Sequence, residues 1–172
     1  MIVSAKKDAG LSDSLSRISL RRALVEDEEF LFKVYAATRR EEIAGWGLDA
    51  AQQEMFLRMQ FRAQQFQYED YDDSGKSIIM EDDGPIGRLI VSRSESEIHL
   101  VDIALLPEHR SGGIGTKILE DLFNEASERN IPLRLEVSAV NRAAGLYKRL
   151  GFRIVDESET YLRMEWRSAG QS

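Results

Sequence analysis

The spacing of apolar residues divides the chain into a regular series of short elements. Ile18, Leu20 and Ala23 are interleaved with polar residues, which predicts a first strand with one face inward. A helix is expected next, because acidic residues at 26–29 suit the positive end of a helix. Its expected buried stripe consists of Phe30, Leu31, Val34 and Ala37.

A second, longer helix is predicted after the break at 45–47. Asp49 is a good N-cap for it. Its apolar residues recur at helical spacing and are Met55, Phe56, Met59, Ala63 and Phe66. Met55, Met59 and Phe66 are at least as well explained by a core, where methionine adapts well to irregular gaps, as by a wall that binds a substrate.

The remainder of the chain alternates between strand and helix patterns. Residues 77–80 and 86–91 flank a turn at 82–85, which predicts a β-hairpin. The acidic stretch 69–74 before it is expected to be a solvated loop. A further strand should contain Leu133, Leu135 and Val137, and a short helix should run from Asn141 to Gly151. Residues 152–155 and 161–166 are expected to form a last hairpin through Ser158.

A glycine-rich turn joins the central strand, which begins at Ile98, to a helix with a strong apolar face. The helix is indicated by Ile118, Leu119, Leu122, Phe123 and Ala126. Successive backbone N–H groups in such a turn, together with the helix dipole, attract a phosphate. Two common phosphate loops do not fit. A dinucleotide fingerprint needs glycine at Ile118, and a P-loop needs Gly-Lys where Thr116 and Lys117 stand.

Two motifs carry a resemblance to a known family. Residues 110–115 have the form R-x-x-G-x-G between a strand and a helix, which resembles the pyrophosphate loop of the GNAT superfamily of acyl-coenzyme A-dependent N-acyltransferases. A plain glycine turn before a surface helix would explain this loop alone. Residues 141–152 add the segment N-x-x-A-x-x-L-Y-x-x-x-G-F, which is similar to a second GNAT segment. The resemblance is sharp between Ile98 and Phe152.

The resemblance implies an α/β (α+β) GNAT fold with a mixed central sheet of about six to seven strands flanked by about four helices. A single N-acetyltransferase domain is expected over residues 17–167. Residues 1–16 are expected to be a flexible N-terminal tail, because they carry charges among serines and lack an apolar core. Residues 168–172 are expected to be a C-terminal tail.

The resemblance also implies where acetyl-coenzyme A binds. Backbone N–H groups of Ile103, Ala104 and Leu105 would hold the pantetheine arm and polarise the thioester carbonyl, and Asn141 would add its amide. Asn141 can also serve as a helix cap. The pyrophosphate would lie on the loop residues Arg110, Ser111, Gly112, Gly113, Ile114, Gly115 and Thr116.

Catalysis requires an unprotonated amine and often an acid for the leaving thiolate. Tyr147 looks like the family's proton donor, although packing alone would also explain it. His99 is the favoured base, because imidazole titrates near neutral pH and relatives commonly place a Glu or His base on this strand. Asp102, which alternates to the opposite face, is the other candidate base. His109 is not expected to be the base. By resemblance, Trp46 lines the acceptor pocket.

The charge and composition of the chain limit the classes of molecule that it is expected to bind. Lys and Arg total 23 against 30 Asp and Glu, for a net charge of −7, which argues against nucleic acid and anionic membranes. The chain has no cysteine and 2 histidines, so no metal site is expected. These features favour a cytoplasmic protein, and a homodimer stays open. The preferred function is acetylation of a small-molecule primary amine by direct attack on acetyl-CoA. The alternatives are a protein or peptide N-acetyltransferase and a non-catalytic CoA-binding sensor.

Overall fold

The computed structural model describes residues 17–68, 71 and 75–170. It contains two compact units. The first comprises the described residues up to Leu89 together with Ile103–Ile114. The second comprises Ile90–Asp102 and the described residues from Gly115 onward. The predicted tail at 1–16 and most of the predicted acidic loop at 69–74 lie outside the described residues. The expectation of one domain over 17–167 stays a prediction.

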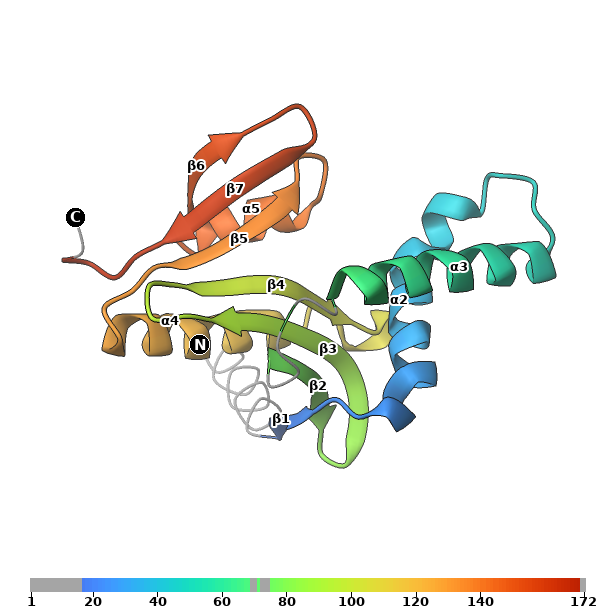
Figure 1. Cartoon of the computed structure of the whole chain (residues 1–172), viewed down its shortest axis with the longest axis horizontal. Helices are drawn as coiled ribbons and strands as arrows, with labels where there is room; N and C mark the ends of the chain where they lie inside the picture. The colour runs from blue at the N-terminus through green and yellow to red at the C-terminus, as the bar shows by residue number, and fades with distance from the viewer. Residues whose placement is uncertain (1–16, 69–70, 72–74, 171–172) are drawn as a thin grey trace, which may run out of the picture. The chain divides into compact units, whose positions relative to one another are not determined.

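Seven strands form one mixed sheet in the order β1-β2-β3-β4-β5-β7-β6. The pairs β1–β2, β5–β7 and β6–β7 are antiparallel, whereas β4–β5 is parallel. The strands are β1 Ile18–Arg22, β2 Lys76–Glu81, β3 Gly84–Arg93, β4 Ile98–Leu105, β5 Leu133–Ser138, β6 Arg153–Glu157 and β7 Tyr161–Trp166 (Figure 1). The predicted hairpins and the mixed α/β class are confirmed.

Four α-helices occur in the described part of the chain, as predicted. They are α2 Glu28–Ile43, α3 Ala50–Tyr68, α4 Ile114–Glu128 and α5 Ala143–Arg149. Two short 3-10 turns, η1 Val25–Asp27 and η3 Pro107–His109, precede α2 and α4. The element order therefore follows the sequence pattern, with these turns added.

In the first unit, α2 packs against α3. Asp49 begins α3 as predicted, because its carboxylate accepts the Gln52 N–H at 2.9 Å while the Gln52 side chain accepts the Asp49 N–H at 3.0 Å. The buried cluster between the helices consists of Tyr35, Ala36, Ile43, Leu57 and Phe61. The buried stripe of α2 is therefore centred on residues 34–36, and Phe30, Leu31 and Ala37 are only half-buried.

The predicted core face of α3 is wrong. Met55, Met59 and Phe66 are 72%, 61% and 73% exposed, whereas Leu57 and Phe61 are buried. Leu57 is two residues from both methionines, which places it about 200° around the helix from them. The sequence offers two apolar faces on this helix, and packing against α2 selects the one that contains Leu57.

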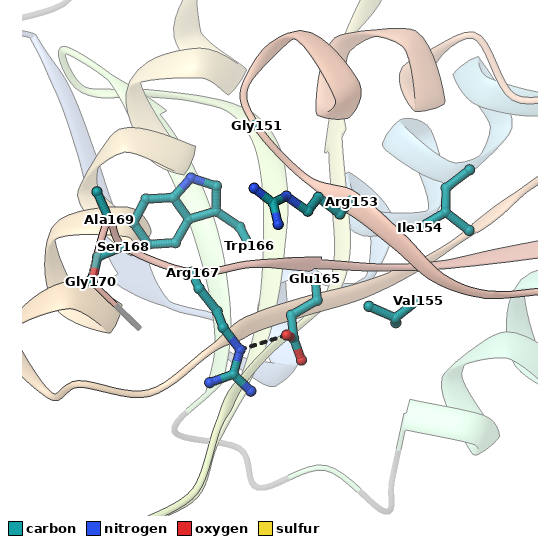
Figure 2. A pocket seen from close by; sticks show the side chains of 10 residues that line it. All are labelled: Gly151, Arg153, Ile154, Val155, Glu165, Trp166, Arg167, Ser168, Ala169 and Gly170. Atoms are coloured by element: carbon teal, nitrogen blue, oxygen red, sulfur yellow. Dashed lines mark hydrogen bonds and ion pairs between the residues drawn. The ribbon is translucent and has the colours of Figure 1, made fainter. Parts of the chain in front are cut away.

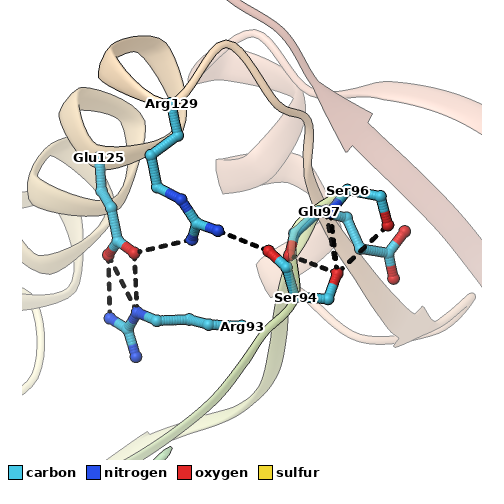
Figure 3. Close-up of polar contacts among 6 residues, drawn as sticks. All are labelled: Arg93, Ser94, Ser96, Glu97, Glu125 and Arg129. Carbon is cyan, nitrogen blue, oxygen red and sulfur yellow. Dashed lines mark hydrogen bonds and ion pairs between the residues drawn. The ribbon is translucent and has the colours of Figure 1, made fainter.

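In the second unit, α4 buries the apolar face that its sequence predicts, apart from the half-buried Phe123. Side chains of its C-terminal half form hydrogen bonds with residues at the β3–β4 turn (Figure 3). Arg93 donates to Glu125 at 2.8 Å, and Arg129 donates to the Ser94 carbonyl at 2.5 Å. These bonds fix the helix that follows the glycine loop.

The C-terminal hairpin completes the second unit beside α5 (Figure 1). Gly151 ends the helix region with φ +96, a left-handed conformation that favours glycine. Phe123 stacks on Trp166 with ring centroids 4.4 Å apart and contacts Phe152 at 5.7 Å. The predicted turn is confirmed, since the Ser158 hydroxyl accepts the Tyr161 N–H at 3.1 Å.

Candidate active site

The glycine loop leaves β4 through η3 and enters α4, as the sequence predicts. Arg110 donates from Nε to the Leu105 carbonyl at 2.9 Å, so the guanidinium is tied to the end of β4 while its two terminal nitrogens take no part in this bond. Ser111 and Gly113 adopt left-handed φ values of +65 and +83. Turns that contain such left-handed residues can present successive backbone N–H groups to one anion.

The loop has the space that a phosphate needs. A Cβ built on Gly112 or Gly115 would meet no heavy atom within 4 Å, so both glycines border open space. Backbone N–H groups of a glycine loop, a helix start and an arginine fork form a donor set suited to a pyrophosphate. The loop residues therefore fit the diphosphate part of coenzyme A.

The end of β4 offers backbone groups beside this loop. The register between β4 and β5 covers Ile98–Leu100, although β4 continues to Leu105. On the β3 side, a side chain at Gly87 would collide with the Ala104 carbonyl oxygen. Because it has no side chain, Gly87 lets β3 approach β4 closely. The strand β3 therefore packs directly against Ile103–Leu105, the residues predicted to bind the pantetheine arm.

His109 has a structural partner. Its Nδ1 lies 2.8 Å from a carboxylate oxygen of Glu81, which links η3 to the end of β2. This contact suits the expectation that His109 is not the base.

Tyr147 lies on the inner face of α5 and is only 7% exposed. Its ring packs edge-on against Phe152, with centroids 5.5 Å apart. Burial, and then the charge of Asp102, raises the pKa of Tyr147 to about 12. The phenol therefore keeps its proton at neutral pH, which is the form that can act as an acid. The negative charge of Asp102, the alternative base, thus contributes to the raised pKa of Tyr147.

His99 is half-buried and lies on the face of β4 opposite to Asp102. In the parallel pairing of β4 with β5, its partner residue is Arg134. His99 lines a cavity of about 700 Å³ together with charged residues of β5, β6 and β7. Burial lowers the pKa of His99 below its usual value, while Glu97 and Glu136 act in the opposite direction. The imidazole is therefore neutral at pH 7 and able to accept a proton.

The cavity around His99 contains charged residues that the sequence reasoning missed. Arg134 bridges Glu97 at 2.5 Å and Glu165 at 2.7 Å, and Arg163 donates to Glu136 at 3.0 Å. The alternation of apolar and charged residues along β5 contains this signal, since Arg134 and Glu136 fall between buried leucine and valine positions. The structure thus brings His99 together with a charged ladder.

Asn141 and Trp46 each contact residues that lie close to them in the sequence. The Asn141 side-chain oxygen accepts the N–H of Ala143, the first residue of α5, at 2.9 Å. Trp46 is 51% exposed and packs edge-on against Phe56 at 5.2 Å. Its predicted contact with an acceptor stays a prediction.

A second cavity of the C-terminal unit contains none of the predicted site residues. Its volume is about 880 Å³, and β6 and β7 line it next to Trp166 and the Arg167–Glu165 pair (Figure 2). Among the residues that the structure describes, no cluster of three or more His, Cys, Asp or Glu side chains could hold a metal ion. No helix in the described ranges is long and apolar enough to cross a membrane.

Comparison with known proteins shows which family the central part of the chain resembles. Residues 73–154 match the family model of the acetyltransferase (GNAT) domain, and this segment contains both sequence motifs. The match covers a little less than half of the chain and identifies residues 73–154 as similar to a GNAT acetyltransferase domain. The matched segment also contains His99, Asp102 and Tyr147, whereas Trp46, α2 and α3 precede it.

Similar GNAT proteins are known. The chain is 33% identical over 84 residues to the [ribosomal protein bS18]-alanine N-acetyltransferase of Haemophilus influenzae. That match covers 48% of this chain and 58% of the relative, so the chain spans little more than half of the relative's length.

Two solved structures show the same fold. The PaiA N-acetyltransferase of Thermoplasma acidophilum, in complex with coenzyme A, has a TM-score of 0.64 at 20% identity, covering 87% of this chain and 98% of that one. The ribosomal-protein-S18-alanine N-acetyltransferase of Escherichia coli has a TM-score of 0.56 at 21% identity, covering 90% and 97%. At these identities the likeness concerns the GNAT fold.

Proposed function

We propose that this protein is an N-acetyltransferase that moves an acetyl group from acetyl-CoA to a primary amine by direct attack on the thioester. The observation that carries the proposal is the glycine loop, where Gly112 and Gly115 border open space beside the Arg110 guanidinium. A likeness in fold to a protein crystallised with coenzyme A supports it.

The proposed cofactor contacts follow from the donor groups. Residues 110–116 bind the pyrophosphate through backbone N–H groups and Arg110. Backbone N–H groups of Ile103–Leu105 hold the pantetheine arm and polarise the carbonyl, and the Asn141 amide nitrogen contributes while its oxygen accepts the Ala143 N–H. Acetyl-CoA supplies the acetyl thioester, and the protein supplies position and charge stabilisation.

Two side chains move protons in this proposal. Tyr147, whose phenol stays protonated at neutral pH, donates its proton to the leaving thiolate. His99, whose lowered pKa keeps it neutral, accepts the proton of the amine through water, because it lies on the face of β4 opposite to Asp102 and Tyr147. Asp102 is the alternative base, and its negative charge also helps to keep the Tyr147 phenol protonated.

The acceptor proposed first is a small molecule such as an amino acid, a polyamine or an amine-bearing antibiotic, with Trp46 as part of the pocket wall. A second candidate is the terminal amine of a protein, because the chain resembles two enzymes named for acetylating the alanine of ribosomal protein S18. A CoA-binding sensor without catalysis is the alternative from a different class.

An acceptor panel separates these proposals. The full chain is incubated with acetyl-CoA and, in parallel, with amino acids, polyamines, aminoglycosides and short peptides that begin with alanine. Product masses are then measured. Acetylation of a small amine supports the first proposal, acetylation restricted to peptide N-termini supports the second, and tight acetyl-CoA binding without any product supports the sensor.

A further inference from the structure

A groove of about 510 Å³ runs between α2 and α3 in the first unit. None of the residues assigned above to the cofactor or to catalysis lines it. Its walls are the 29–40 face of α2 and the first half of α3, up to Arg58. It is therefore a feature that the proposed acetyl transfer does not use.

The floor of the groove is apolar and well packed. Ala36 and Leu57 belong to the buried cluster between the helices, and Phe32 packs against that cluster. Phe32 also contacts Phe61 edge-on, with ring centroids 5.7 Å apart. Such a floor is preformed, so a partner side chain that rests on it does not have to order it.

One end of the groove holds a charge cluster whose members satisfy one another. Arg58 donates to Glu29 and to Glu54, each at 3.0 Å, and its guanidinium lies 4.1 Å from the centre of the Phe32 ring. With one arginine and two glutamates, this end of the groove carries a net charge of −1, so the positive charge that could attract an acidic partner comes from elsewhere in the groove.

Lys33 and Arg40 differ from that cluster. Both line the groove from α2, and neither has an ion-pair partner within 4.0 Å among the described residues. They are seven residues apart, which is two turns or about 10.5 Å along one helix face. In a chain with a net charge of −7, this is a local pair of uncompensated cations beside an apolar floor.

We propose that this groove docks an acidic amphipathic helix of a partner protein. Two carboxylates of that helix, seven residues apart, pair with Lys33 and Arg40. The apolar side chains midway between them rest on Phe32 and Leu57, where the small Ala36 permits close approach of the two helices. The two cations favour a partner helix with acidic residues, and the apolar floor favours a helix that also has an apolar face.

The probe is a capped, alanine-based helical peptide with two glutamates seven residues apart and leucines midway, labelled for fluorescence anisotropy. Its binding to the full chain is compared with that of two control peptides, one with glutamine for glutamate and one with alanine for leucine. The protein variants are Lys33→Glu with Arg40→Glu, and the control Arg39→Glu on the same helix, which does not line the groove but loses its own ion pair with Glu42.

Saturable binding of the acidic peptide is expected. Affinity should fall more than about tenfold in the double variant, in the glutamine peptide and in high salt, because these changes remove or screen the charge pairs. It should change less than about twofold in Arg39→Glu. Melting temperatures close to wild type confirm that the substitutions leave the fold intact.

Three results would overturn the proposal. One is absence of binding at millimolar peptide, and another is equal binding of the acidic and glutamine peptides. The third is self-association of the protein that the double variant abolishes while the peptide does not bind, which would identify a second copy of the chain as the occupant.

Discussion

Two regions that look equally regular in sequence behave differently in the structure. Between Ile98 and Phe152, the apolar face expected on α4 is largely buried and Tyr147 packs inside. In α3, Met55, Met59 and Phe66 are exposed, and Leu57 and Phe61 form the core instead. The difference teaches that periodicity finds a helix reliably, whereas its buried face is decided by the surface against which it packs.

The largest expected effect tests the region that the motifs identified. Gly115→Asp places a carboxylate where Gly115 now borders open space, so it should abolish acetyl-CoA binding by repulsion of the pyrophosphate. The protein should stay folded, because Gly115 is in the first turn of α4, where an acidic residue is favourable. Isothermal titration calorimetry measures the affinity.

Gly115→Ala is the matched control, since it adds a Cβ without charge. Its affinity should lie between those of wild type and Gly115→Asp. Undiminished affinity in a folded Gly115→Asp protein would remove the phosphate-loop assignment.

Sequence reasoning reached this loop for a physical reason. A phosphate site needs backbone N–H groups, a left-handed turn and a helix start, and glycines at fixed spacing record all three. The charged ladder around His99 was missed because its members, such as Arg134 and Arg163, come from separate strands. Strand register brings such side chains together, and no short motif encodes register.

Tyr147→Phe should have the next largest effect. The ring and its contact with Phe152 are kept and only the hydroxyl is lost, so turnover should fall by roughly 10²–10⁴-fold. Acetyl-CoA affinity should change little, and stability should fall by less than about 1.5 kcal/mol. Turnover, calorimetric affinity and melting temperature are measured on this one variant. Wild-type turnover would exclude Tyr147 as the acid.

The two faces of α3 can be compared directly through stability. Leu57→Ala should lower the free energy of unfolding by about 2–5 kcal/mol, because it opens a cavity in the buried cluster. Met59→Ala should change it by less than about 0.5 kcal/mol, because Met59 is mostly exposed. Denaturant titration of both variants measures the difference. Equal losses would mean that Met59 is buried after all, as the sequence pattern predicted.

The smallest expected effect concerns pH. His99 must be neutral to accept a proton, and burial lowers its pKa, so turnover should fall on the acidic side only below about pH 6.5. His99→Ala should lower turnover and remove this acidic limb. The rate profile of Asp102→Asn is the comparison. An acidic limb that persists in His99→Ala but disappears in Asp102→Asn would transfer the role of base to Asp102.

The central claim is that this chain catalyses acetyl transfer, and steady release of free coenzyme A thiol tests it most directly. Thiol formation is followed with acetyl-CoA and each amine of the panel, and compared with the amount of acetylated amine. The proposal predicts continuous thiol release that requires an amine, equals the acetylated product and is lost in Gly115→Asp. Calorimetric binding of acetyl-CoA without amine-dependent thiol release from any acceptor would contradict it.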